Sequence, residues 1–340
     1  MKKISIIIFV LTFTYSAKAQ ELSTSQDSIG VFYDKLFSVM KKEYLYKEEV
    51  NWKEIEPKIR ENLTPYSDFQ SSLQEITTLF DFAKADHSAV YYKDDRFSGT
   101  PDGPTEKDFS DQWLKKFATQ PVFEVKVLDH QFGYILMPGM RSEKNIHEQS
   151  QLMYDEINKI KSSENLKGWI IDLRFNTGGD IWPMLLPLYD FLGNNVVWGE
   201  MDIHKNQINK IKLKKGKYKS NSKTVSYINP KGELLDHTKV AVITNIATGS
   251  SGEITALAFK GRENTIFIGE KTNGKTTTNY RRNLPFGAYM TLTMGYDCDR
   301  NEKFYEYIIP DIHIVKQDNF ENLLLDKNIQ EAIKFISITE

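Results

Sequence analysis

The segment from Lys239 to Lys275 most tightly constrains how this chain folds, because it reads as a strand, a tight turn, a helix and a second strand. The apolar run Val240–Thr244 predicts a buried strand, and the small residues Ala247–Gly252 predict the turn. Helical periodicity follows from Glu253 to Lys260, and Ile266–Ile268 reads as the next strand. A parallel strand–helix–strand unit brings both strand ends to one edge of a sheet, so the segment predicts an α/β fold.

Ser250 lies where this turn enters the helix. Its hydroxyl is therefore exposed, and backbone N–H groups are close enough to stabilise an oxyanion. Lys275 follows the next strand and should lie at the same edge of the sheet. A serine-rich turn taken alone is most often only a helix cap. It therefore indicates a catalytic serine only together with the motifs on either side of it.

A second motif lies upstream, where GWIIDLRFNTGG occupies residues 168–179 and places an apolar strand before D-L-R-x-N-x-G-G. In the first segment, Ser250 begins an S-x-x-E pattern and GEKTNGK follows at residues 269–275. Together the two motifs resemble the active-site blocks of the C-terminal processing (tail-specific) serine peptidases. That family is related to tricorn core protease and to interphotoreceptor retinoid-binding protein. The resemblance implies a crotonase-like (ClpP/crotonase) core of strand–helix units, and peptide-bond hydrolysis without a cofactor.

The same resemblance implies roles for four residues. Ser250 would be the nucleophile and Lys275 the general base, and the N–H groups of Gly179 and Ser251 would form the oxyanion hole. A lysine acts as a base only when its amine is neutral, which burial favours. The hydroxyls of Thr276–Thr278 could orient that amine.

A different base remains open. Asp86-His87-Ser88 resembles the family's D-x-H-[ST] block, and tricorn-type relatives use a histidine there as the base. Glu306 matches an acid that tricorn-like members use, although a structural role is expected for it here. We prefer Lys275 because the full lysine motif is present. A third reading is a non-catalytic lipid- or retinoid-binding protein on the same fold, against which the intact Ser250, Lys275 and Gly179 argue.

The chain of 340 residues divides into four expected parts. Residues 1–19 read as a signal peptide, with Lys2-Lys3, a short apolar stretch and Ala17-Lys18-Ala19 before a cleavage site preceding Gln20. This predicts a periplasmic or secreted protein that keeps no stable membrane span. Residues 20–92 read as a helical subdomain, 93–121 as a linker and 122–340 as the peptidase core. About thirty linker residues are too few for the PDZ domain that many relatives carry there.

Further elements follow from periodicity. Ser67 is expected to cap the third N-terminal helix, and Pro187 should kink or shift a helix within Trp182–Phe191. The lysine-rich Lys205–Lys223 reads as a solvated hairpin, although it could attract acidic substrates or membrane surfaces. Asn319–Ile336 reads as a C-terminal helix.

Composition excludes several other classes of protein. The net charge of −2 gives no indication of nucleic-acid binding. The family resemblance implies a peptide or unfolded protein as the partner. Cys298 is the only cysteine, so no internal disulfide forms. The six histidines are scattered, and neither H-E-x-x-H nor a P-loop occurs, so no metal site is expected.

Overall fold

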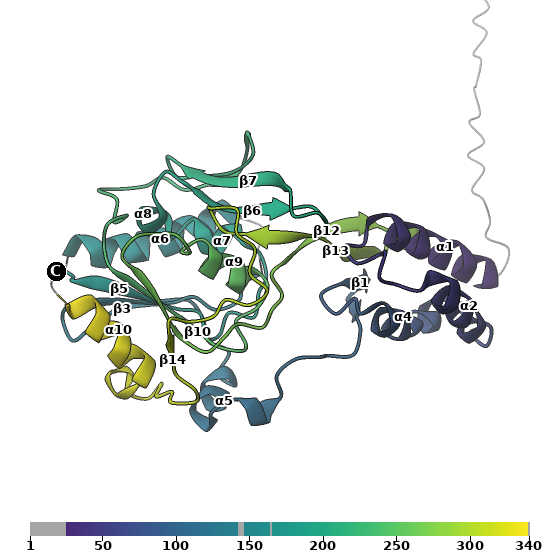
Figure 1. Ribbon diagram of the computed structural model, residues 1–340, viewed down its shortest axis with the longest axis horizontal. Helices are drawn as coiled ribbons and strands as arrows, with labels where there is room; N and C mark the ends of the chain where they lie inside the picture. The colour runs from purple at the N-terminus through teal and green to yellow at the C-terminus, as the bar shows by residue number, and fades with distance from the viewer. Residues whose placement is uncertain (1–24, 142–145, 164, 339–340) are drawn as a thin grey trace, which may run out of the picture.

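The structure is a computed structural model that describes residues 25–141, 146–163 and 165–338. The expected signal peptide and its cleavage site lie outside the described residues. Within the described part of the chain, no helix is both long and apolar enough to cross a membrane. The fold is mixed α/β, as predicted, and a large lobe built on sheets is joined to a smaller helical lobe by a two-stranded ribbon (Figure 1).

The large lobe is organised around a six-stranded sheet in the order β14-β11-β10-β5-β4-β3. All neighbouring strands are parallel except β3, which is antiparallel to β4. The strands are β3 (Glu124–Leu128), β4 (Phe132–Leu136), β5 (Gly168–Asp172), β10 (Val240–Thr244), β11 (Thr265–Gly269) and β14 (Ile312–His313). The central strands β4, β5 and β10 are buried along their whole length, which explains why their sequences are continuous apolar runs.

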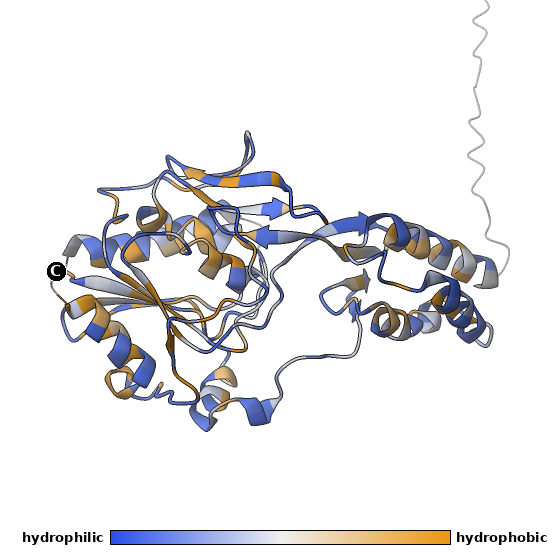
Figure 2. Ribbon diagram, in the orientation of Figure 1, coloured by the Kyte–Doolittle hydropathy of each residue, from blue (hydrophilic) through white to orange (hydrophobic). Residues whose placement is uncertain are grey.

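Helices cover both faces of this sheet. One face packs against α6 (Ile146–Ser163), α7 (Trp182–Leu185), α8 (Tyr189–Leu192) and α9 (Ser251–Leu257). The other face packs against α5 (Asp111–Phe117) and α10 (Lys327–Ser337). Alternate residues of β5 divide between the two layers, with Ile171 in the first and Ile170 in the second. Apolar residues are concentrated on these strands and on the helix faces that meet them (Figure 2).

The second sheet is antiparallel and reaches from the large lobe to the helical lobe. Its order is β2-β1-β13-β6-β7-β8-β9, with β12 also paired to β13. The strands are β1 (Ala89–Tyr92), β2 (Asp95–Phe97), β6 (Val196–Met201), β7 (Gln207–Lys214), β8 (Lys217–Ser220), β9 (Lys223–Tyr227), β12 (Thr277–Asn283) and β13 (Tyr289–Cys298). The β12–β13 ribbon connects the two lobes (Figure 1). Lys205–Lys223 contributes the hairpin β7–β8, as its sequence predicted.

The helical lobe consists of α1 (Ser25–Glu43), α2 (Trp52–Leu63), α3 (Phe69–Ser72) and α4 (Glu75–Ala83). Their apolar faces form a separate core cluster with the outer half of β13, where Met290 and Leu292 are fully buried. The helical lobe is therefore held to the rest of the chain by hydrophobic packing on the ribbon.

Of four local expectations, three differ from the structure and one agrees with it. Asp68, not Ser67, caps α3, because its carboxylate accepts the N–H of Ser71. The C-terminal helix begins at Lys327 rather than Asn319, because Asp326 caps it there. The region 93–121 is not only a loop, since it contains β2, a short 3-10 helix at Glu106–Asp108 and α5. Pro187 does interrupt the helix in its region, because α7 ends before it and α8 begins after it.

Candidate active site

Ser250 lies between β10 and α9 in a backbone conformation that non-glycine residues rarely adopt. Its φ is 54° and its ψ is −120°. Such strain persists only where surrounding contacts enforce it, and it is often found at functional sites. Gly178 packs directly against this turn, where a Cβ atom would lie 2.9 Å from the Ser250 Cβ. The turn therefore holds the hydroxyl at a fixed place beside the glycine loop that follows β5.

Glu253 is the buried carboxylate that supports this turn. Its oxygens accept the N–H groups of Ser250 (2.9 Å), Gly274 (2.8 Å) and Lys275 (2.7 Å), and the hydroxyl of Thr272 (2.6 Å). Burial raises the pKa of Glu253 to about 7, whereas these hydrogen bonds act in the opposite direction. One side chain thus ties the start of α9 to the segment that follows β11.

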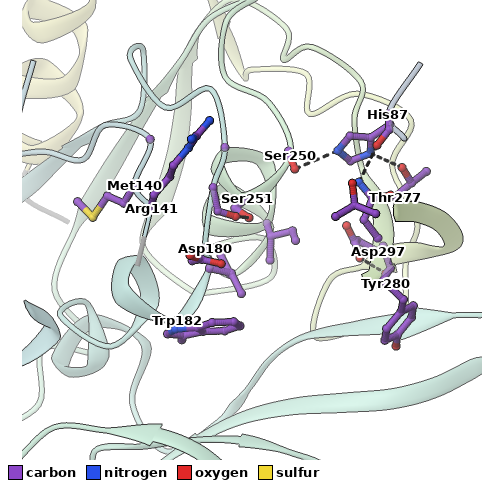
Figure 3. Close-up of a pocket in the computed structure, with 18 of the residues that line it drawn as sticks. His87, Met140, Arg141, Asp180, Trp182, Ser250, Ser251, Thr277, Tyr280 and Asp297 are labelled. Carbon is purple, nitrogen blue, oxygen red and sulfur yellow. Dashed lines mark hydrogen bonds between the residues drawn. The ribbon is translucent and has the colours of Figure 1, made fainter. Parts of the chain in front are cut away.

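His87 is the residue that the structure brings to Ser250. Its Nε2 lies 3.0 Å from the Ser250 Oγ, and its Nδ1 lies 2.6 Å from the Thr277 Oγ1 (Figure 3). The backbone carbonyl of His87 also accepts the side-chain amide of Asn279 at 2.7 Å. Burial, helped by the charge of Lys275, lowers the pKa of His87 to about 4. At neutral pH the ring is therefore uncharged, and its Nε2 can accept the serine proton when Nδ1–H donates to Thr277.

Lys275 points to a different partner. Its ammonium forms an ion pair with the carboxylate of Asp86, and within the described residues no hydrogen bond joins it to Ser250. The Thr276–Thr278 hydroxyls likewise do not orient this amine. Thr276 bonds the Tyr305 carbonyl, Thr277 meets His87, and Thr278 bonds Asp297.

Gly179 and Ser251, the two expected oxyanion donors, are in direct contact. The Ser251 hydroxyl donates to the Gly179 carbonyl at 2.6 Å. Gly179 has a φ of +122°, and a Cβ there would lie 1.7 Å from the Met140 carbonyl oxygen, so the position requires glycine. In the described part of the chain, neither the Gly179 nor the Ser251 N–H is engaged in a hydrogen bond. Both donors are thus available next to the serine hydroxyl.

Glu306 is not part of this arrangement. Its side chain is exposed, and among the described residues only its backbone carbonyl is hydrogen-bonded, accepting the Thr276 hydroxyl at 3.3 Å. It lines neither of the two cavities that contain Ser250. Thr277 stands at the outer nitrogen of His87, where a carboxylate would complete a Ser–His–acid triad.

Two cavities meet at Ser250 and His87. The larger, of about 780 Å³, also contains Gly179 and Ser251. The smaller, of about 430 Å³, is lined by aromatic side chains of Phe109, Trp113 and Phe117, which stack on one another in and beside α5. This apolar wall was not predicted from the sequence, because residues 93–121 were expected to be a linker. The N-cap Ser110, followed by Trp113 and Phe117 at helical spacing, was the available signal.

Comparison with known proteins decides the family. Residues 131–314, more than half of the chain, match the model of peptidase family S41. The chain belongs to peptidase family S41. The resemblance of the sequence motifs to a family of serine peptidases is thereby confirmed.

Individual relatives are more distant. The S41 chain is 32% identical over 163 residues to a nisin-resistance protein of Lactococcus lactis subsp. lactis, a match that covers 46% of this chain and 50% of that protein. The chain thus spans only half the length of that relative. A lipoprotein from Streptococcus agalactiae has a similar structure, with a TM-score of 0.65, 22% identity and coverage of 97% of this chain and 99% of the other. A Parabacteroides merdae protein named as a candidate peptidase follows, with a TM-score of 0.59, 16% identity and coverage of 94% and 98%. These two structures share the fold across nearly the whole chain.

Proposed function

We propose that this S41 protein is a serine endopeptidase in which Ser250 is the nucleophile and His87 the general base. The observation that carries the proposal is the 3.0 Å separation between the His87 Nε2 and the Ser250 Oγ, on an imidazole that is neutral at pH 7. A nucleophile and its base need to lie within hydrogen-bonding reach, and a third group commonly orients the base. Thr277 provides that third contact.

The reaction follows from this geometry. The His87 Nε2 removes the hydroxyl proton as the Ser250 Oγ attacks the peptide carbonyl carbon. The carbonyl oxygen, now negative, receives hydrogen bonds from the N–H groups of Gly179 and Ser251, each worth about 3–4 kcal/mol in comparable enzymes. The imidazolium then gives its proton to the leaving amine. A water molecule, deprotonated by the same nitrogen, hydrolyses the acyl-enzyme and restores Ser250.

The Ser250–Lys275 dyad is the second candidate. It would require Lys275 to leave Asp86 and lose its proton, because an ammonium cannot act as a base. The Ser–His arrangement needs neither change. The sequence motifs favour the lysine, whereas the contacts of the folded chain favour His87.

The same proposal includes a substrate class, a cellular location and a division into domains. The substrate is a peptide or an unfolded protein, with an apolar side chain seated against Phe109, Trp113 and Phe117. The relative named for nisin resistance makes nisin a first compound to test. We place the mature protein in the periplasm or outside the cell, with cleavage before Gln20. We divide it into a helical subdomain (20–92), a connecting segment (93–121) that contains β2 and α5, and a crotonase-like core (122–340) without a PDZ domain.

The test is cleavage of casein by the chain beginning at Gln20, with Ser250→Ala, His87→Ala and Lys275→Ala alongside. We expect His87→Ala to lower kcat by about 10²- to 10⁴-fold, as loss of a general base does, and Ser250→Ala to abolish cleavage. Lys275→Ala should retain most of the activity, as should the surface control Lys271→Ala. Loss in Lys275→Ala with retention in His87→Ala would instead establish the lysine dyad. Absence of cleavage by folded wild-type protein would lead to a search for co-purified lipid.

A further inference from the structure

Two acidic side chains face each other at a buried position in the second sheet. Asp297 on β13 and Glu200 on β6 are direct cross-strand partners in the antiparallel register. Asp297 is fully buried and Glu200 is only 7% exposed. Like charges directly opposite each other on neighbouring strands destabilise a sheet, and burial without a counter-charge increases that cost.

The hydrogen bonds around the pair leave one oxygen without a partner. The Glu200 carboxylate accepts the Asn209 side-chain amide at 2.9 Å and the Tyr280 hydroxyl. The Oδ1 of Asp297 accepts the Thr278 hydroxyl, whereas its Oδ2 is buried without any hydrogen bond. Within residues 25–141, 146–163 and 165–338, no lysine, arginine or histidine forms an ion pair with either acid. The described residues therefore provide no cation that pairs with either acid.

The electrostatics agree with this geometry. Burial, together with the charge of Glu200, raises the pKa of Asp297 to about 8. Asp297 thus keeps its proton at neutral pH until a positive charge arrives nearby. Folding alone gives no benefit from such a pair, since two apolar residues of similar size would serve the sheet as well or better.

Both acids line the larger cavity, which also contains Ser250 and His87. Figure 3 shows Asp297 beside Thr277 and Tyr280, across the cavity from Asp180 and Trp182. Two adjacent residues of β12 fix its place, because Thr277 bonds His87 and Thr278 bonds Asp297. The acidic pair consequently lies within the reach of a peptide whose scissile bond is at Ser250.

We propose that Glu200 and Asp297 form a subsite that binds a cationic side chain, lysine or arginine, of the peptide substrate. Glu200, which retains a little exposed surface, makes the first contact, and Asp297 lies behind it as a second negative charge. The long apolar stem of lysine or arginine fits the walls of the cavity while its charged end reaches the acids. This subsite rests on the proposed function, because it assumes that the cleft holds a peptide.

The test separates binding from cleavage by using the Ser250→Ala variant of the chain beginning at Gln20. The probes are fluorescent, end-blocked peptides of eight residues that differ only in the position of one lysine or one norleucine, and anisotropy gives each Kd. We expect one position at which lysine binds at least about tenfold more tightly than norleucine, as expected for a desolvated charge pair. That preference should fall to about threefold or less after adding Asp297→Asn or Glu200→Gln, and should persist with the exposed control Glu263→Gln.

Asn and Gln keep an oxygen for the Thr278 and Tyr280 hydroxyls, and thermal melting confirms that each variant is folded. Equal binding of lysine and norleucine at every position, absence of binding, or a preference that survives both substitutions would overturn the subsite. Cleavage of the same peptides by the Ser250 form distinguishes the two proposals. A lysine preference in binding without any cleavage refutes the peptidase proposal alone. Cleavage without a lysine preference refutes the subsite alone.

Discussion

His87 illustrates how its neighbours set both the position and the protonation of one side chain. Thr277 holds its Nδ1, Asn279 holds its backbone carbonyl, and Ser250 meets its Nε2. Burial and the nearby Lys275 charge keep the ring neutral. Lys275, although paired with Asp86 and not bonded to the serine, therefore still affects the site, because its positive charge opposes protonation of His87.

This arrangement predicts the acid limb of the pH–rate profile. The pKa of His87 is lowered to about 4, so kcat/KM should be constant near neutral pH and fall as the pH drops through about 4. Lys275→Met removes a positive charge that lowers this pKa, so the limb should move upward by up to about one pH unit. Lys271→Met should leave it in place. An acid limb that does not move in Lys275→Met would contradict the electrostatic role assigned to Lys275.

The same group contributes to stability with a definite sign. Its folded pKa lies below the ordinary value of 6.5, so the unfolded chain takes up the proton first as the pH falls. The stabilising contribution of neutral His87 is therefore complete above about 6.5 and is lost as the pH falls towards 4.

Glu253 gives a second prediction at this scale. A carboxylate offers two accepting oxygens to three backbone N–H groups and the Thr272 hydroxyl, whereas glutamine offers only one. Glu253→Gln should therefore leave at least one buried N–H unsatisfied, at a cost of about 1–3 kcal/mol in the free energy of unfolding. Because one of these groups belongs to Ser250, kcat should fall as well. Urea denaturation and steady-state kinetics measure the two effects, and a variant with unchanged kcat would show that the turn holds without Glu253.

At the scale of elements, the sequence was most informative where one strand or helix carries its own pattern. The apolar run Val240–Thr244 is β10 at the same bounds, and the lysine-rich segment Lys205–Lys223 contributes the hairpin β7–β8 that its sequence predicted. The sequence did not predict the short helix α5, because that helix depends on packing against its surroundings. The seven residues of α5 are stabilised by packing of Trp113 on Phe175, a contact between elements far apart in the chain.

The aromatic wall of α5 leads to a prediction about substrate choice. Phe117 lines the smaller cavity and is 44% exposed, so Phe117→Ala should change the cavity with little effect on folding. We expect KM to rise by about 5- to 30-fold for peptides with a large apolar side chain at that subsite, and less for peptides with alanine there. Phe82→Ala, another exposed phenylalanine away from the cleft, is the matched control. Equal changes for both kinds of peptide would remove Phe117 from substrate binding.

At the scale of the whole molecule, the two candidate catalytic residues come from different lobes. His87 follows the last helix of the helical lobe, whereas Ser250 belongs to the large lobe. They are 163 residues apart in the chain, and no local pattern encodes their meeting. The sequence motifs indicated Ser250, Gly179 and Ser251 as candidates and favoured Lys275 as the base, whereas the contacts of the folded chain favour His87. That choice depends on how the β12–β13 ribbon carries the helical lobe to the cleft.

This dependence predicts that loosening the helical lobe will impair a serine located elsewhere. Leu292 on β13 is fully buried in the helical core cluster, so Leu292→Ala should cost about 2–5 kcal/mol locally. Amide hydrogen exchange should then accelerate in α1, α2 and α4 while β5 and β10 stay protected. Because His87 moves with the loosened lobe, kcat should fall over the same temperature range in which these helices begin to exchange.

The control is a substitution that creates a comparable cavity in the large lobe, far from the helical lobe. Ile336 of α10 is 4% exposed and packs beneath the six-stranded sheet, so Ile336→Ala should affect protection near β5 before that of α4. If His87 is the base, Leu292→Ala should lose activity at temperatures where the large lobe is still fully protected. If activity persists while the helices exchange freely, then catalysis does not need the helical lobe. The base must in that case come from the large lobe, where Lys275 is located, because a histidine carried by an unfolded segment cannot hold a 3.0 Å contact with Ser250.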